Sequence, residues 1–117
     1  MKLRIQDDTL RLRLTRGEVD DLGRGLAVER SVHFSGGRAL QYIVTGSAAS
    51  ASPQATYSGD AIRVSLPEAL VKTWATGDEV GIEGQDGPIR ILVEKDFQCL
   101  HRDAPAEPDA FPNPMGE

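Results

Sequence analysis

The sequence predicts a mainly β fold of the α+β class, a pseudo-twofold β-barrel of two ββαββ repeats with two short helices. One observation is that residues 2–28 align without a gap on residues 54–80, shifted by 52 positions. The identical pairs are Asp8/Asp60, Arg11/Arg63, Leu14/Leu66, Val19/Val71, Gly25/Gly77 and Val28/Val80. Apolar residues also fall in register, at Ile5/Tyr57, Leu10/Ile62, Leu12/Val64 and Leu22/Trp74. Because such agreement is typical of two copies of one supersecondary unit, repeats are expected over 2–44 and 54–95.

The first element is a hairpin over residues 2–14. LRLRL at 10–14 alternates strictly, so its leucines lie on one face of a strand and its arginines on the other. KLRI alternates in the same way, and the intervening QDDT is rich in turn formers. We therefore expect a hairpin with one apolar face and one basic face.

A short helix is expected over 16–23. Thr15 followed by Glu18 is the pattern of a capping box, and Val19 with Leu22 gives an apolar stripe. Glycines at the end of the segment can supply a left-handed exit. GLAVERSVHF and RALQYIV, separated by SGG, are then expected to form a second hairpin.

The second half has the same order of elements. QATY and AIRVSL flank SGD as a hairpin, and EVGIEG with IRILVEKD forms the closing one. Pro67 suits the first position of a helix, and Gly77 suits its end. The helix face expected to be apolar contains Leu70, Val71 and Trp74. TGSAASASP, between the halves, has the composition of a mobile connector.

The two repeats are expected to form a single domain over 1–102. Four strands with one short helix cover their apolar face poorly, so the two units should interleave their strands into a closed or nearly closed barrel. Closure would also remove exposed strand edges. Fusion of the units predicts a monomer, because each half has its partner tethered to it. Residues 103–117 are expected to form a separate acidic, proline-rich C-terminal tail.

Composition limits the classes of function. A net charge of −5 disfavours a general nucleic-acid binder, since affinity for polyanions depends mainly on Lys and Arg. No apolar run approaches the roughly 20 residues of a membrane span, and the start MKLRIQDD lacks a signal-peptide core. Cys99 is the only cysteine, which fits a reducing compartment. A cytoplasmic location is the resulting expectation.

The first candidate binding site is a basic strip on the first hairpin. If this hairpin buries its leucines, four cations emerge together on its other face: Lys2, Arg4, Arg11 and Arg13. One interpretation is an ordinary solvated strand face. Another is that the tail, with Phe111 and Met115 as apolar anchors, folds back over the strip, and a disordered tail is the alternative to that.

The second candidate is the pair Cys99 and His101, with His33 in the other half. These residues could begin a zinc site or a nucleophilic site. Paired ligand spacing such as C-x-x-C is absent, as are an orienting partner and a glycine-rich oxyanion turn. No metal, cofactor or catalytic residue is therefore expected, and Cys99 is interpreted as a small buried apolar residue.

The segment RVSLPEALVKTWATGDEVGIEG resembles the repeat of AbrB-type swapped-hairpin proteins. The shared features are Leu66, Pro67 and Glu68 at the helix start and Gly77, Asp78 and Val80 at the next strand. Because that family pairs two such units, the resemblance implies that both are fused here. Its DNA-contacting arginines lie around the first hairpin, which would make the basic strip a DNA reader. The second half has Gln54, Thr56, Arg63 and Ser65 at the equivalent positions.

LRLRLTRGEV, ILVEKDFQCLH and DAFPNP together resemble a family of small bacterial proteins that share a domain of unknown function. This resemblance implies a bacterial, cytoplasmic protein and assigns no activity to any position. We expect a non-enzymatic binding or regulatory module whose partner is a protein or a small anionic ligand and which has no membrane partner. The alternatives are a DNA-binding transcriptional regulator of the swapped-hairpin type and a small-molecule or metal-dependent enzyme that uses Cys99 and His101.

Overall fold

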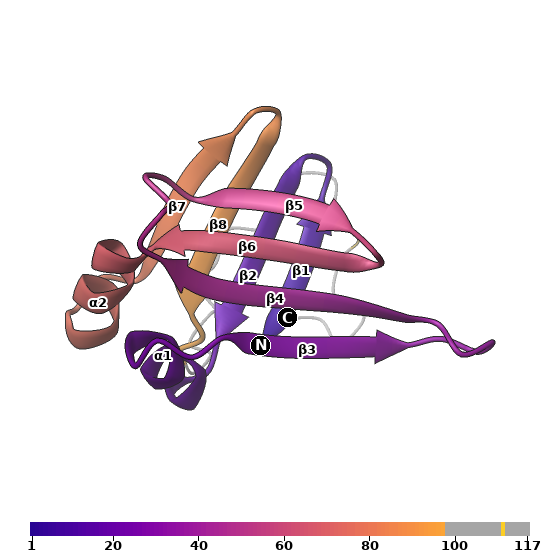
Figure 1. The fold of residues 1–117 in the computed structure, drawn as a ribbon, viewed down its shortest axis with the longest axis horizontal. Coiled ribbons are helices and arrows are strands. Elements are labelled where there is room, and N and C mark those ends of the chain that lie inside the picture. Colours follow the sequence, from indigo (N-terminus) through magenta and orange to yellow (C-terminus); the bar gives the residue numbers. More distant parts are fainter. Residues whose placement is uncertain (98–110, 112–117) are drawn as a thin grey trace.

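The computed structural model describes residues 1–97 and residue 111. In this part of the chain, eight strands form two four-stranded sheets, and both helices lie at one end of them (Figure 1). The strands are β1 (Lys2–Gln6), β2 (Thr9–Leu14), β3 (Val28–His33), β4 (Ala39–Ser47), β5 (Gln54–Ser58), β6 (Ala61–Pro67), β7 (Gly81–Asp86) and β8 (Ile89–Lys95). The helices are α1 (Arg16–Gly23) and α2 (Glu68–Thr76). The order along the chain is therefore ββαββ, followed by ββαββ.

Each sheet contains one hairpin from each half of the chain. The strand order is β1-β2-β8-β7 in the first sheet and β3-β4-β6-β5 in the second. Parallel pairing of β2 with β8, and of β4 with β6, joins the halves, whereas the hairpins themselves are antiparallel. The halves thus interleave, and Figure 1 shows the strands of one sheet crossing those of the other. Both strand orders have two ends, so the closed barrel remains a prediction.

The first hairpins of the two units have the same register. Lys2 lies opposite Arg13 in β1 and β2, and Gln54 lies opposite Ser65 in β5 and β6. Both pairs are related by the shift of 52 positions seen in the sequence. The shift places Leu12 and Val64 at corresponding positions of the two sheets, and both are buried.

The shift does not extend to the third strand of each unit. Val44 and Val93 occupy equivalent positions, because each lies beside the inner strand of the other half's first hairpin. Val44 pairs with Val28, and Val93 pairs with Ile82. Val28 and Ile82 are 3% and 7% exposed, whereas Val80 is 55% exposed. The residue of the second unit that is equivalent to Val28 is therefore Ile82. The predicted equivalence of Val28 with Val80 is wrong by two residues. One reason is that α2 has nine residues and α1 has eight.

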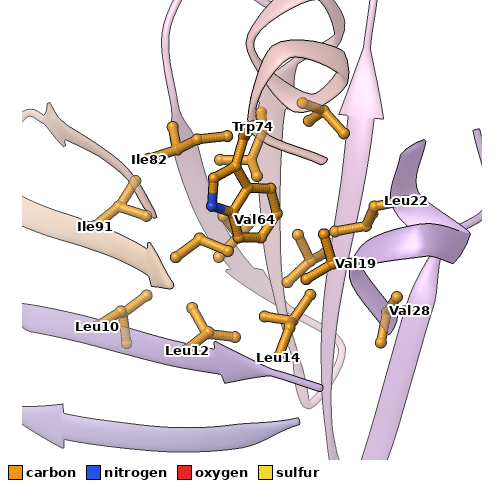
Figure 2. Close-up of a cluster of buried hydrophobic side chains, with 14 of the residues drawn as sticks. Leu10, Leu12, Leu14, Val19, Leu22, Val28, Val64, Trp74, Ile82 and Ile91 are labelled. Carbon is orange, nitrogen blue, oxygen red and sulfur yellow. The ribbon is translucent and has the colours of Figure 1, made fainter. Parts of the chain in front are cut away.

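The core lies between the two sheets and is covered by both helices. Alternate residues of β2, β6 and β8 point inward, and Trp74 of α2 packs among them (Figure 2). The Trp74 side chain is fully buried, and its indole Nε1 donates a hydrogen bond of 3.1 Å to the Val80 carbonyl. A buried indole needs such an acceptor. One hydrophobic cluster therefore contains residues from both sheets and both halves.

The helix termini agree with the sequence at α1 and differ at α2. Thr15 and Glu18 form the expected capping box. Pro67 ends β6 and is the residue before α2 rather than its first residue, and it makes no side-chain cap. Leu70 is 47% exposed, so its assignment to the buried face is wrong. Val71 and Trp74, three residues apart, form that face, and Leu70 lies at its rim.

Candidate functional site

The outer face of the first sheet contains all four residues of the basic strip. Lys2 lies directly opposite Arg13, and Arg4 lies directly opposite Arg11, on neighbouring strands β1 and β2. The intervening leucines of β2 point into the core, so these cations point away from it. Like charges directly opposite each other repel and destabilise a sheet. The hairpin therefore requires compensating acids.

Two such acids are Glu94 on β8 and Asp96, which follows the end of β8. Lys2 Nζ lies 3.1 Å from Asp96 Oδ2. The Nε atoms of Arg11 and Arg13 lie 3.2 Å and 3.8 Å from Glu94 Oε1. The Nε atom of Arg11 is buried and has no hydrogen-bond acceptor of suitable geometry, so its interaction with Glu94 is electrostatic. Asp96 and Glu94 thus pair with three of the strip's cations, Lys2, Arg11 and Arg13.

A shallow hollow of about 540 Å³ lies over the centre of this face. Its lining residues are Arg4, Gln6, Asp7, Thr9, Arg11, Glu83, Arg90, Leu92 and Glu94. Arg90 on β8 pairs with Glu83 at 3.2 Å and adds a fifth cation to the strip's side of the molecule. The lining is mostly polar, and guanidinium groups in such a hollow can hold a carboxylate or a phosphate by paired hydrogen bonds.

Sequence reasoning missed Glu83, Arg90, Leu92 and Glu94 as members of this surface. The alternation in IRILVEK does indicate that Arg90, Leu92 and Glu94 share a face. It does not show that β8 lies beside β2, because this depends on a parallel pairing between distant segments. That pairing places Leu92 next to Arg11 and Glu94 next to Arg13.

The corresponding face of the second sheet has a different composition. Arg63 occupies the position of Arg11, and its Nη1 donates to the Ser58 carbonyl at 3.4 Å. The other positions that match the basic strip are Gln54, Thr56 and Ser65. The residue beside Arg63 on β4 is Ile43, which is buried. The two hairpins therefore share their inner face but not their charge.

His33 is the one residue of the second candidate site that lies within the described part of the chain. His33 lies exposed at the end of β3. Cys99 and His101 lie outside the described residues, and so does Met115. Among residues 1–97 and 111, no group of three His, Cys, Asp or Glu side chains is placed to hold a metal ion. Phe111 is 96% exposed, so the prediction that it is an apolar anchor is wrong.

A buried carboxylate, Glu18, lies in the first turn of α1. Its Oε2 accepts from the α-ammonium group of Met1 at 2.7 Å and pairs with Arg30 of β3. Its Oε1 accepts from the Thr15 backbone N–H at 2.8 Å. Burial alone would raise the pKa of Glu18, but the hydrogen bonds from Met1 and Thr15 lower it below the usual 4.5. The sequence indicated only the capping role of this residue.

A second hollow, of about 400 Å³, lies at the tip of the β3–β4 hairpin. Its lining residues are Phe34, Ser35, Arg38, Ala39, Leu40, Tyr57 and Asp60. Arg38 and Asp60 pair at 2.7 Å across its rim, and the side chains of Phe34 and Tyr57 are largely exposed. We call this the aromatic hollow.

Together these features define a two-sheet, mainly β protein with a patch of opposed cations on one outer face. Neither helix within residues 1–97 has the length and apolar composition needed to cross a membrane. The chain belongs to the family of unknown function DUF7009, whose model matches residues 1–115. No curated protein and no solved structure matches it. The expected membership in a family of unknown function is thereby confirmed, and no activity is assigned with it.

Proposed function

We propose that this protein is a non-enzymatic binding module whose basic strip holds an anionic partner. The observation that supports this most directly is the two pairs of opposed cations, Lys2 with Arg13 and Arg4 with Arg11. Such an arrangement costs stability in the free protein, and a bound anion would recover it. The equivalent hairpin of the second sheet, which has the same register, lacks the arrangement, so the fold does not require it.

The partner is expected to present a row of oxyanions. These are either the carboxylates of a protein or the phosphates of a small ligand. Neighbouring cations on one face of a strand are about 7 Å apart, twice the rise per residue. Alternate residues of an extended acidic peptide have the same spacing. Glu94 and Asp96 reduce the strip's positive charge, which favours a modest, salt-sensitive affinity.

The test compares two arginines at structurally matching positions. Arg11→Gln removes a strip cation, and Arg63→Gln removes the cation at the same place on the other sheet. Calorimetric titrations with tripolyphosphate and with hexaglutamate distinguish the two sources of oxyanions. We expect Arg11→Gln to weaken binding about tenfold, the effect of one lost charge-assisted contact, and Arg63→Gln to leave it within about twofold. If both variants lost the same affinity, the basic strip would not be the binding site.

Binding to DNA is an outcome of the same test rather than a second proposal. A polyanion reader gains affinity with each neutralised phosphate, and the net charge of −5 opposes this. If the wild type and Arg63→Gln retained duplex DNA at low salt while Arg11→Gln did not, that result would favour the DNA-binding regulator over the binding module.

We further propose that the two ββαββ units are copies of one repeat, related by a pseudo-twofold axis, in a single domain that acts as a monomer in the bacterial cytoplasm. The common register of the two first hairpins supports the repeat. Monomeric behaviour is supported by the interleaving, because each half supplies the strands that the other lacks. Native mass spectrometry of the full chain tests this, and a stable dimer at micromolar concentration would contradict it.

A further inference from the structure

We propose that a hollow beside the two helices is a second binding site, for a small zwitterion with an apolar side chain, that is, a free apolar amino acid or a short apolar peptide. The hollow has a volume of about 470 Å³ and lies where α1, the end of α2 and the ends of β2 and β8 meet. It does not include the basic strip, so this inference goes beyond the proposed function. We call it the helix hollow, and its lining residues are Leu14, Arg16, Val19, Asp20, Ala75, Gly77, Lys95, Asp96 and Phe97.

The helix hollow has an apolar floor. Leu14 and Val19 are buried members of the core and lie near each other in Figure 2. Ala75 of α2 and the ring of Phe97 add further apolar surface, and the Phe97 side chain is 56% exposed. Sites for small molecules are commonly concave, mostly apolar and about 300–1,000 Å³ in volume. The helix hollow therefore has the size and the apolar surface to cover the side chain of a small ligand.

Two of its charged residues already have partners within the protein. Lys95 Nζ donates to the Gly77 carbonyl at 2.9 Å, and Asp96 Oδ2 lies 3.1 Å from Lys2 Nζ. The backbone N–H of Asp96 also donates to the Leu14 carbonyl at 2.8 Å. These contacts hold the end of β8 against β2 and against the end of α2, so this wall of the hollow is formed before any ligand binds.

The other two charged residues, Arg16 and Asp20, have no such partner in residues 1–97. None of the ion pairs in this part of the chain includes either side chain. They lie four residues apart on α1, which places their Cβ atoms about 5–6 Å from each other on one side of the helix. A cation that precedes its acid by four residues is the less favourable order for pairing on a helix. The hollow therefore presents a positive and a negative group side by side.

A related hollow in the other half shows what a closed pair looks like. The shift of 52 positions places Glu68 at the position of Arg16, and it places Lys72 at the position of Asp20. Both line a sister hollow of about 350 Å³ between α1, the start of α2 and β4. There Glu68 Oε1 lies 3.1 Å from Lys72 Nζ, in the favourable order. In the aromatic hollow, too, the lining cation and acid pair with each other. The helix hollow differs from both because its two charges are left for a ligand.

A zwitterion satisfies both charges at once. Its carboxylate can accept two parallel hydrogen bonds from the Arg16 guanidinium, and its ammonium group can donate to the Asp20 carboxylate. A simple anion would bring its charge close to Asp20, and a simple cation would bring its charge close to Arg16, so each would meet repulsion. An apolar side chain on the zwitterion would leave water for the floor of the hollow, which adds affinity.

The experiment separates the two charges in the ligand and in the protein. L-leucine carries both charges, N-acetyl-L-leucine carries only the carboxylate, and L-leucinamide carries only the ammonium group. L-leucyl-L-leucine places the two charges farther apart and so distinguishes a peptide from an amino acid. Each is titrated into the full chain, and the backbone amide shifts of Val19 and Ala75 report binding.

The variants are Arg16→Gln and Asp20→Asn, which change exposed side chains of α1. Glu68→Gln and Lys72→Gln are the matched controls, because they change the corresponding positions of the sister hollow. We expect L-leucine or L-leucyl-L-leucine to bind the wild type about tenfold more tightly than either singly charged ligand, the effect of one charge-assisted contact. Arg16→Gln should abolish the preference over L-leucinamide, and Asp20→Asn should abolish the preference over N-acetyl-L-leucine. Both controls should stay within about twofold of the wild type.

Three results would overturn the inference. One is the absence of any amide shift around Val19 and Ala75 with millimolar zwitterion. Another is binding of N-acetyl-L-leucine or L-leucinamide as tight as that of the zwitterions, because the site would then recognise one charge only. The third is an equal loss of affinity in the sister-hollow controls. None of them bears on the basic strip, whose binding of tripolyphosphate is measured separately, so the proposed function stands or falls by its own test.

Discussion

The hairpins β1–β2 and β5–β6 have the same register and opposite kinds of outer face. Their inner residues correspond one by one, as with Leu12 and Val64, and both are buried in one cluster. Their outer residues share a single cation, Arg11 in one and Arg63 in the other. The inner face is constrained by packing, where each methylene matters. The outer face is free to differ, and the first hairpin has opposed cations there at a cost in stability, which is the basis of the proposed binding site.

The two helices show the same division between the halves. Trp74 of α2 and Leu22 of α1 correspond in the sequence shift, and both are buried. The first half is held at its helix by a polar cluster around Glu18, whereas the second half has no side-chain cap and a larger apolar residue. The halves therefore reach the same fold through different interactions.

The largest expected effect tests whether the second half contributes more of the core. Trp74→Ala should lower the free energy of unfolding by about 4 kcal/mol, because it leaves a large cavity and removes the indole hydrogen bond to the Val80 carbonyl, which keeps only the bond from the Lys95 backbone N–H. Leu22→Ala at the corresponding position should cost about 3 kcal/mol. Urea unfolding followed by far-UV circular dichroism measures both. A Leu22→Ala loss greater than that of Trp74→Ala would contradict this ranking.

The next effect concerns the polar cluster of the first half. Glu18→Gln should cost about 2 kcal/mol at pH 7, because the Met1 ammonium and Arg30 lose their shared carboxylate. Since the folded-state pKa lies below 4.5, the stabilisation is present above that pH and disappears as the pH falls through the lowered value. The difference between variant and wild type should therefore shrink by pH 3. Urea titrations at the two pH values measure it.

The matched control for this substitution is Glu68→Gln in the first turn of α2. Glu68 pairs with Lys72 in an exposed i, i+4 contact at 3.1 Å. Such pairs contribute about 0.5 kcal/mol or less. A loss in Glu68→Gln as large as that in Glu18→Gln would mean that the cluster adds nothing beyond an ordinary surface charge.

The sequence predicts local structure here better than it predicts the surface. Strand alternation and the capping box place β2 and α1 correctly, because both depend on residues close together in the chain. The order of elements in each half follows from the same local patterns. The equivalence of Val28 with Ile82 was missed, since it depends on pairing with a distant strand.

The candidate site was only half predictable for the same reason. The cations of β1 and β2 alternate within one hairpin, and the sequence brings them together. Glu94 and Arg90 join them through the parallel ladder between β2 and β8, which no local pattern specifies. The hollow and its mixed charge are properties of that ladder.

A smaller effect is expected where the third strands of the two units differ. The position that Arg30 occupies on β3 is taken on β7 by Gly84, against which Pro53 packs. A Cβ at Gly84 would lie 2.7 Å from Pro53 Cγ, so Gly84→Ala should cost about 1.5 kcal/mol. Gly17→Ala is the control, because a Cβ there meets nothing within 4 Å and should stabilise α1 by about 0.5 kcal/mol. Thermal melts that show the same sign for both would be inconsistent with this packing.

The smallest effect on stability, and the most direct on the strip, belongs to Glu94. Glu94→Gln removes the acid shared by Arg11 and Arg13, so repulsion between the strip cations should lower stability by about 0.5 kcal/mol. The same change should raise the affinity for tripolyphosphate about threefold, because the anion no longer competes with a fixed carboxylate. Glu29→Gln, on the outer face of the second sheet, is the control for net charge. If both variants gain affinity equally, the anion responds to the whole molecule's charge, and the contrast between the two hairpins has no functional meaning.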